Sequence, residues 1–92
     1  MSDRRHLFPL GSIVATPGVL ELLTHEDIQR SLVRHVHGDW GVVEADDKRA
    51  NDSALKRGER LLSAYHAKQG PKFWVITEAD RSTTTVLLPD EY

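Results

Sequence analysis

The segment from residue 34 to residue 40 holds the densest group of side chains that could do chemistry. His35, His37 and Asp39 fall within five residues, and such a set could bind a metal ion or transfer a proton. Residues two apart on a helix do not face each other, however, so the two histidines could share an ion only if the helix had already ended. No further His, Cys or carboxylate stands at a fixed ligand spacing. The pattern favours a helix end whose histidines interact with exposed carbonyl groups, and it predicts neither a metal site nor a cofactor.

A second polar segment runs from residue 78 to residue 85. One interpretation is a hairpin turn, in which Asp80 bonds to the backbone and Arg81 pairs with a neighbouring carboxylate. The functional interpretation places Arg81 at a strand edge, where it would bind a phosphate or stabilise a transition state, with His35 or His37 as acid–base partner. Those three residues would be the catalytic set of a metal-independent ribonuclease, but the residue types favour the turn.

Acidic and aromatic side chains offer a different kind of site. Four carboxylates cluster around one predicted helix, namely Glu44, Asp46, Asp47 and Asp52. Such clusters are usually solvated surface. The functional interpretation is a negatively charged patch that binds a basic partner. Trp40 is expected to fill a gap between helix and sheet, although interfaces draw their energy from a few aromatic and arginine anchors. The candidate partner-binding residues are therefore Trp40, Trp74, Arg81, Glu44, Asp46 and Asp47.

The C-terminal third of the chain must position most of these residues. It predicts three strands, over residues 60–67, 72–78 and 82–88. These segments hold aromatic and β-branched side chains, and turns that contain Gly, Pro or Asp separate them. Leu61, Leu62 and Tyr65 also fit helical spacing, but Gly58 before them and the Gly-Pro turn after them favour a strand. A three-stranded meander is stable on its own only if something covers its apolar face.

The first two thirds of the chain supply that cover. Residues 10–16 predict a strand, and Thr16-Pro17 begins a short helical turn. Thr24 opens a helix that ends at Gly38, and residues 44–57 form a second main helix with acidic residues first and basic residues last. The predicted order is β-α-α-β-β-β. We expect a single α+β domain over residues 1–92, in which two helices cover one face of a small antiparallel sheet and leave the other face for a partner, a ligand or a second copy.

Composition excludes several classes of protein. The chain has 92 residues and no cysteine, which rules out disulfides, thiolate catalysis and cysteine-based zinc sites. Its formal charge of −2 lacks the excess of Lys and Arg that is usual in proteins that bind nucleic acid. No apolar run approaches the roughly 18 residues of a membrane span, and the run near the N-terminus is too short for a signal peptide. We therefore expect a cytoplasmic protein that binds neither a membrane nor nucleic acid directly.

Three blocks of the sequence together form a recognisable pattern. They are residues 13–18, residues 34–35 with 38–41, and residues 77–82 running through 84–85 and 87–89 to Glu91-Tyr92. In these blocks the chain resembles a family of small bacterial proteins carried on plasmids and integrative elements. The resemblance spans nearly the whole chain and implies a bacterial cytosolic protein of a mobile element, with no activity or catalytic residue to carry over. Accessory proteins of such elements often inhibit host defences, as anti-restriction and anti-CRISPR proteins do.

The predicted element order also looks like the RelE/ParE-type toxin fold, in which some members cleave RNA. Such toxins are typically basic, whereas the predicted strands here carry little beyond Arg60, Lys72 and Arg81 at their ends, and a shared topology does not fix a function. We therefore expect a non-enzymatic interaction module that binds a host or phage-defence protein complex. The alternative is a small RelE/ParE-like ribonuclease or toxin that needs no metal, and the free sheet face is also suited to a homodimer.

Overall fold

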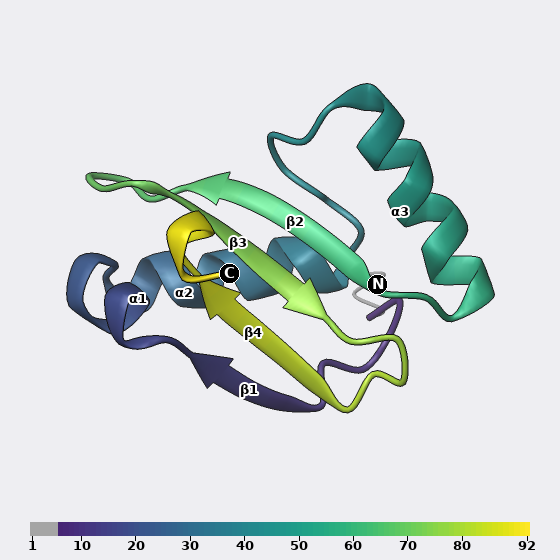
Figure 1. Ribbon diagram of the computed structural model, residues 1–92, viewed down its shortest axis with the longest axis horizontal. Coiled ribbons are helices and arrows are strands. Elements are labelled where there is room, and N and C mark those ends of the chain that lie inside the picture. The colour runs from purple at the N-terminus through teal and green to yellow at the C-terminus, as the bar shows by residue number, and fades with distance from the viewer. Residues whose placement is uncertain (1–5) are drawn as a thin grey trace, which may run out of the picture.

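The structure is a computed structural model and describes residues 6–92. Its centre is a sheet of four strands in the order β1-β4-β3-β2 (Figure 1), namely β1 (Ser12–Ala15), β2 (Leu61–His66), β3 (Lys72–Thr77) and β4 (Thr83–Leu87). Strands β2, β3 and β4 form the expected antiparallel meander. The α+β class and the element order are confirmed. The sheet is mixed rather than purely antiparallel, because β1 runs parallel to β4. The long connection between these two strands contains helices as well as β2 and β3.

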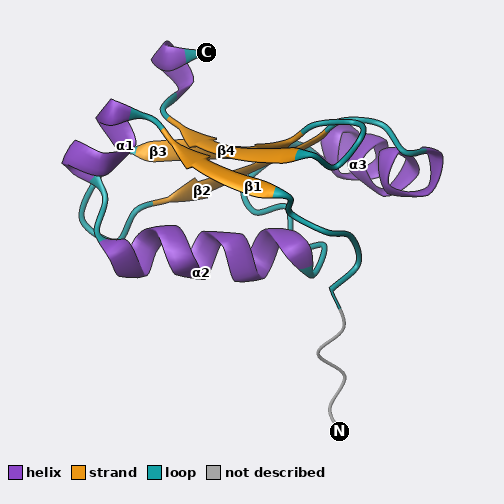
Figure 2. Cartoon of the chain, turned by 90° about the horizontal axis from the view of Figure 1, so that it is seen from below, coloured by secondary structure: helices purple, strands orange, loops and turns teal. Residues whose placement is uncertain are grey.

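Three α-helices and one 3-10 turn surround the sheet. They are α1 (Pro17–Leu22), α2 (His25–Val36), α3 (Ala45–Arg57) and η1 (Pro89–Glu91). Helix α2 lies across one face of the sheet, whereas α3 lies beside β2 at the sheet edge (Figure 2). The reason is that α3 buries only Asn51 and Ala54, too little apolar surface to cover a sheet face. Of the two helices expected on one face, α2 is therefore the one that covers it.

Helix α2 is fixed at its start by a reciprocal cap. The Thr24 hydroxyl accepts a hydrogen bond from the Asp27 N–H at 3.0 Å, and the Asp27 carboxylate accepts one from the Thr24 N–H at 3.1 Å. The second Asp27 oxygen accepts from the Lys68 N–H at 3.1 Å, in the turn between β2 and β3. One carboxylate thus holds the helix start against the sheet.

The core lies between the sheet and its helices in two clusters. One joins α1 to the meander, through Val19, Leu23, Tyr65, Ala67, Phe73, Val75 and Val86, and Ile28 and Leu32 of α2 pack against it. The other joins α3 to β2, through Phe8, Trp40, Ala54 and Leu61. Trp40 is 4% exposed and its indole N–H donates to Asp52 at 3.0 Å, so this side chain fills the gap between helix and sheet and offers a partner almost no surface. Trp40 is therefore corrected from a partner-binding residue to a core residue.

The two edges of the sheet differ. At β2, the Asn51 side-chain amide donates to the Leu62 carbonyl at 2.7 Å and accepts from the Leu62 N–H at 3.1 Å. Two residues further along β2, the Ala64 N–H donates to the Trp40 carbonyl and the Ala64 carbonyl accepts from the Val42 N–H. At β1, the N–H groups of Ser12 and Thr16 bond inward to β4, so the alternate groups of Ile13 and Ala15 face outward, and nothing in residues 6–92 pairs with them. The β2 edge is closed and the β1 edge is open.

The Asn51 contact gives a direct test of the closed edge. Asn51→Ala leaves a backbone N–H and carbonyl of Leu62 without their partner, and we expect it to lower the free energy of unfolding by about 1–3 kcal/mol in urea titrations. Ser53→Ala is the control, because it changes a neighbouring residue of α3 that makes no side-chain hydrogen bond within residues 6–92. Equal stability of the two variants would contradict the assigned role of Asn51.

Candidate functional site

His35 lies at the centre of a buried chain of hydrogen bonds rather than at the surface. Its Nδ1 is 2.6 Å from the Ser63 hydroxyl and its Nε2 is 2.9 Å from the Thr77 hydroxyl. The Thr77 hydroxyl is 2.7 Å from that of Thr84, which donates to the Leu10 carbonyl at 2.7 Å. The imidazole has no exposed surface. The network therefore ties α2 to β2, β3 and β4 through the core.

The direction of these hydrogen bonds sets the protonation of His35. A carbonyl can only accept, so Thr84 donates to Leu10, and Thr77 must then donate to Thr84. Thr77 accepts from Nε2–H of His35, and Nδ1 is left to accept from Ser63. Burial, with a smaller effect of the positive charge on Arg81, lowers the pKa of His35 to about 4. His35 is thus a neutral structural group that no substrate can reach.

The burial of His35 differs from the exposed helix end that the sequence predicted. Helical periodicity carried a signal for it, because His35 comes three residues after Leu32 and seven after Ile28 on the buried face of α2. His37 does lie at the exposed helix end, where its Nδ1–H donates to the Val33 carbonyl at 2.7 Å. In residues 6–92, no three His, Asp or Glu side chains come together as a metal site would require.

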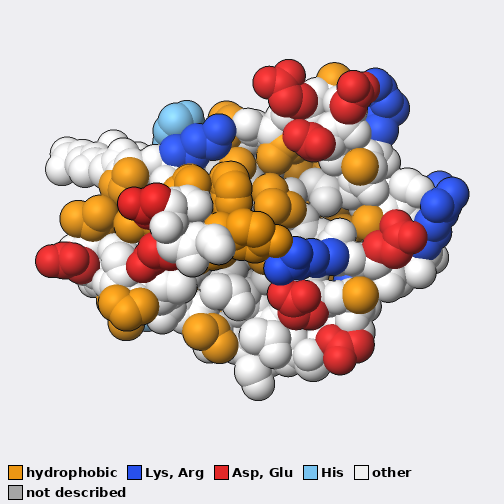
Figure 3. All heavy atoms as spheres, viewed as in Figure 1, with side chains coloured by type: hydrophobic (Ala, Val, Ile, Leu, Met, Phe, Trp, Pro, Cys, Tyr) orange, Lys and Arg blue, Asp and Glu red, His pale blue; other side chains and the backbone are white. Residues whose placement is uncertain are grey.

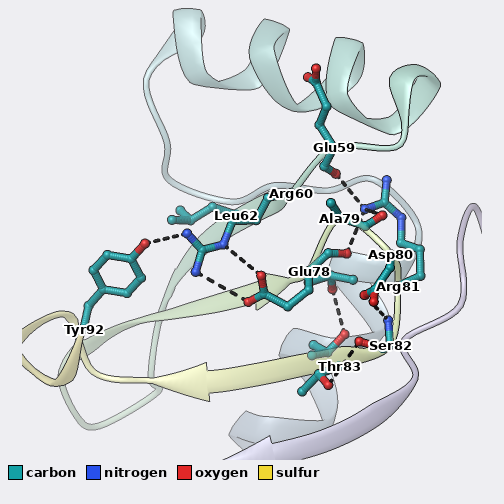
Figure 4. Close-up of polar contacts among 12 residues, drawn as sticks. Glu59, Arg60, Leu62, Glu78, Ala79, Asp80, Arg81, Ser82, Thr83 and Tyr92 are labelled. Atoms are coloured by element: carbon teal, nitrogen blue, oxygen red, sulfur yellow. Dashed lines mark hydrogen bonds and ion pairs between the residues drawn. The ribbon is translucent and has the colours of Figure 1, made fainter.

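Arg81 is engaged by the backbone. Its guanidinium donates to the carbonyls of Glu59 at 2.6 Å, Glu78 at 3.1 Å and Ala79 at 3.3 Å, and so ties the segment after α3 to the β3–β4 turn (Figure 4). In the same turn, Asp80 accepts from the Ser82 N–H at 3.0 Å, as the turn interpretation predicted. Arg81 pairs with carbonyls instead of the expected carboxylate, because the carbonyls that end α3 lie within its reach.

The proposed catalytic trio is not brought together in an accessible place. The Arg81 guanidinium carbon lies 5.6 Å from the centre of the Phe8 ring, and that ring lies 5.2 Å from the His35 ring centre. Phe8 therefore packs against both groups inside the core. His37 stacks edge-on against His6 instead, with 5.5 Å between the ring centres. Arg81, committed to backbone carbonyls, is also a poor anchor for a partner.

In the described part of the chain, the face of the sheet opposite α2 carries only the short C-terminal turn η1 over its strands (Figure 2). Its strand register places Leu62, Ile76 and Thr85 in one row and Ala64, Trp74 and Leu87 in the next. Figure 3 looks onto this face and shows hydrophobic side chains gathered at its centre. We call these two rows the open face. Ala64, Ile76 and Leu87 are each at most 5% exposed, so the chain's own side chains already cover half of these six residues, and the face is less free than the sequence predicted. Leu62, Trp74 and Thr85 stay partly exposed.

A hydrogen bond between Arg60 and Tyr92 spans part of the open face (Figure 4). The Arg60 guanidinium donates to the Tyr92 hydroxyl at 2.6 Å and forms an ion pair with Glu78 at 3.4 Å. The Tyr92 ring meets that of Trp74 edge-on, with 5.7 Å between the centres. Glu91 holds the C-terminal turn in place, since its carboxylate accepts from the N–H groups of Gly18 and Leu88, both at 2.9 Å.

A groove of about 280 Å³ opens between this face and the start of α3. Its apolar lining is Val42, Val43, Leu62, Ala64 and Trp74, and its charged lining is Glu44, Asp47 and Lys72. Three of the predicted binding residues, Trp74, Glu44 and Asp47, are brought together here by the fold. Asp46 lies outside the groove lining and pairs with Arg49 on the exposed side of α3. The sequence did not predict that Val42, Val43 and Leu62 line the groove. The one sequence signal for it is the apolar pair Val42-Val43 directly before acidic residues.

Comparisons of the chain with protein-family models, with curated proteins and with solved structures gave no match in any of the three. Within residues 6–92, every helix is too short or too polar to cross a membrane. The open face and its groove are therefore the features of this chain that bear on its function.

Proposed function

We propose that this chain is a non-enzymatic protein-interaction module that binds its partner through the open face. The observation that carries the proposal is Trp74, a half-buried indole that forms one wall of the groove beside two carboxylates without partners in residues 6–92. Interfaces typically combine an aromatic anchor with an apolar centre and a charged rim. Trp74 with the Val42-Val43 pair and Leu62 supplies the first two, and Glu44, Asp47 and Lys72 supply the rim.

The roles of the other candidate residues support binding rather than catalysis. His35 is neutral and enclosed, and the Arg81 guanidinium donates hydrogen bonds to backbone carbonyls. A ribonuclease without a metal needs an accessible acid–base group beside Arg81, but His35 is enclosed and the exposed His37 lies against His6 instead. No observation on the described residues favours the ribonuclease over the interaction module.

The partner we propose is a host or phage-defence protein complex, met in the bacterial cytoplasm. The support is the resemblance of three sequence blocks to proteins of plasmids and integrative elements. The open face, which suits protein binding better than catalysis, adds to it. On this proposal the chain inhibits that complex by occupying one of its surfaces, as inhibitors of the anti-restriction or anti-CRISPR type do.

Trp74→Ala tests this proposal. We expect the wild-type chain to raise phage plating on a host that carries a restriction or CRISPR system, and to capture components of that system. Loss of one interface anchor of about 2 kcal/mol should weaken the capture about thirtyfold and remove the protection. Val33→Ala is the control, since Val33 is an exposed apolar residue of α2 away from the open face.

The outcome is decisive only for folded variants, so circular dichroism and thermal unfolding accompany each binding measurement. Protection and capture that Trp74→Ala leaves unchanged would exclude the open face as the binding surface. A wild-type chain that protects against neither type of defence would exclude the proposed class of partner.

A further inference from the structure

We propose that the groove beside Trp74 receives an arginine side chain of the partner protein. This inference rests on the proposed function and names the chemistry that the partner must present. It is carried by three features of the groove, which are its size, its apolar walls and its unbalanced charge.

The size of the groove suits one long side chain. Its volume of about 280 Å³ lies just below the roughly 300–1,000 Å³ of sites that enclose a drug-sized molecule. The walls provide a place for an aliphatic stem, because Val42 is 49% exposed and the groove continues over Val43 and Leu62. An arginine buries its methylene stem against such walls while its charged end stays near polar groups.

The charge of the groove favours a cation. Glu44 and Asp47 are three residues apart at the start of α3, a spacing that brings side chains to one helix face. Glu44 occupies the N-cap position but makes no capping hydrogen bond, and neither carboxylate has an ion pair or side-chain hydrogen bond within residues 6–92. Lys72 also lines the groove, so its three charged groups together carry −1, which one guanidinium neutralises.

Trp74 favours arginine over lysine for this position. A guanidinium is planar and only weakly hydrated, so it stacks on an aromatic face and pairs with a carboxylate at the same time. The chain already uses this chemistry, since the Arg34 guanidinium lies 4.6 Å from the Tyr65 ring centre while it donates to Asp39 at 2.7 Å. In the groove, an indole and two carboxylates are present, and Lys72 balances only one of the two negative charges.

The test uses the full chain labelled with nitrogen-15 and two peptides. One is acetyl-Gly-Leu-Arg-Leu-Gly-amide, and the other carries citrulline, which has nearly the shape of arginine but no charge, in place of the arginine. We expect the arginine peptide to shift the indole resonance of Trp74 and the amides of Val42 and Val43, with an affinity about fivefold higher than that of the citrulline peptide. The buried indole of Trp40 serves as the internal reference, because Asp52 already binds it.

Isosteric variants show whether the groove carboxylates cause the preference. The double variant Glu44→Gln with Asp47→Asn should abolish the preference for arginine, whereas Asp46→Asn should retain most of it, because Asp46 lies outside the groove lining. Equal binding of the two peptides, no shift at Trp74, or an equal loss in Asp46→Asn and the double variant would overturn the inference.

The inference and the proposed function can fail separately. The double variant keeps Trp74 and the whole apolar surface, so undiminished capture of the defence complex by this variant would reject the arginine groove and leave the interaction module standing. Loss of capture in Trp74→Ala together with loss of the arginine preference in the double variant would support both.

Discussion

Replacing Gly41 with alanine should lower the free energy of unfolding by several kcal/mol, whereas the same replacement at Gly58 should cost only about 1–2 kcal/mol. Both glycines have a positive φ, +79° at Gly41 and +72° at Gly58. A Cβ at Gly41 would lie 1.9 Å from the Ala64 carbonyl oxygen, whereas at Gly58 it meets no described atom within 4 Å. Since Ala64 accepts the hydrogen bond of Val42, β2 cannot withdraw without losing its closed edge.

The pair of glycine variants separates two physical effects. Gly58→Ala measures the conformational cost of a left-handed alanine, and Gly41→Ala adds the backbone overlap to that cost. Urea titrations followed by tryptophan fluorescence should show a reduction of several kcal/mol for Gly41→Ala, a large share of the roughly 5–15 kcal/mol of a typical domain. Similar midpoints for the two variants would mean that the segment of residues 40–42 does not lie against β2.

The stability of the protein should fall as the pH is lowered from about 6.5 to about 4. The folded state holds His35 neutral with a pKa of about 4, whereas the ordinary value for histidine is 6.5, so the unfolded chain binds the proton first. Stability contributed by the neutral imidazole is complete above pH 6.5 and is lost progressively down to the folded pKa. The difference corresponds to on the order of 3 kcal/mol, at about 1.4 kcal/mol for each pKa unit.

Two variants isolate this effect in urea titrations at several pH values. His35→Gln removes the titrating group and should flatten the dependence between pH 6.5 and pH 4, at a lower overall stability. His37→Gln removes an exposed histidine two residues away and should leave the slope unchanged. The hydrogen bond from Arg34 lowers the pKa of Asp39. The stability that Asp39 contributes is therefore lost only below this pH range, where its carboxylate becomes protonated. A wild-type stability that is constant from pH 6.5 to pH 4 would contradict the enclosed neutral state of His35.

The local parts of the fold could be predicted from the sequence because short-range chemistry determines them. The strand at Leu61–His66 follows from Gly58 before it and the turn at residues 69–71 after it, although its apolar spacing also fits a helix. The start of α2 follows from Thr24 and Asp27, whose reciprocal hydrogen bonds need only a three-residue spacing. In each case the signal and the structure lie within one turn of the chain.

The long-range parts could not be predicted in the same way. Strand β1 pairs in parallel with β4 about seventy residues later, and no local pattern specifies that partner or its direction. Trp74 and Glu44 were both named as binding residues, but only the pairing of β2 with β3 brings them to one groove. Arg81 was expected to contact a neighbouring carboxylate, yet its reach to the Glu59 carbonyl depends on how α3 ends beside the turn.

The unequal edges of the sheet limit how many chains can associate by sharing backbone hydrogen bonds. Within the described residues, β1 offers free N–H and carbonyl groups along its outer edge, while Asn51 and residues 40–42 occupy those of Leu62 and Ala64 in β2. Two molecules that joined β1 to β1 would have only blocked strands at the ends of the combined sheet. Addition of further copies by strand pairing should stop there, so this architecture disfavours growth into a fibre through the sheet edges.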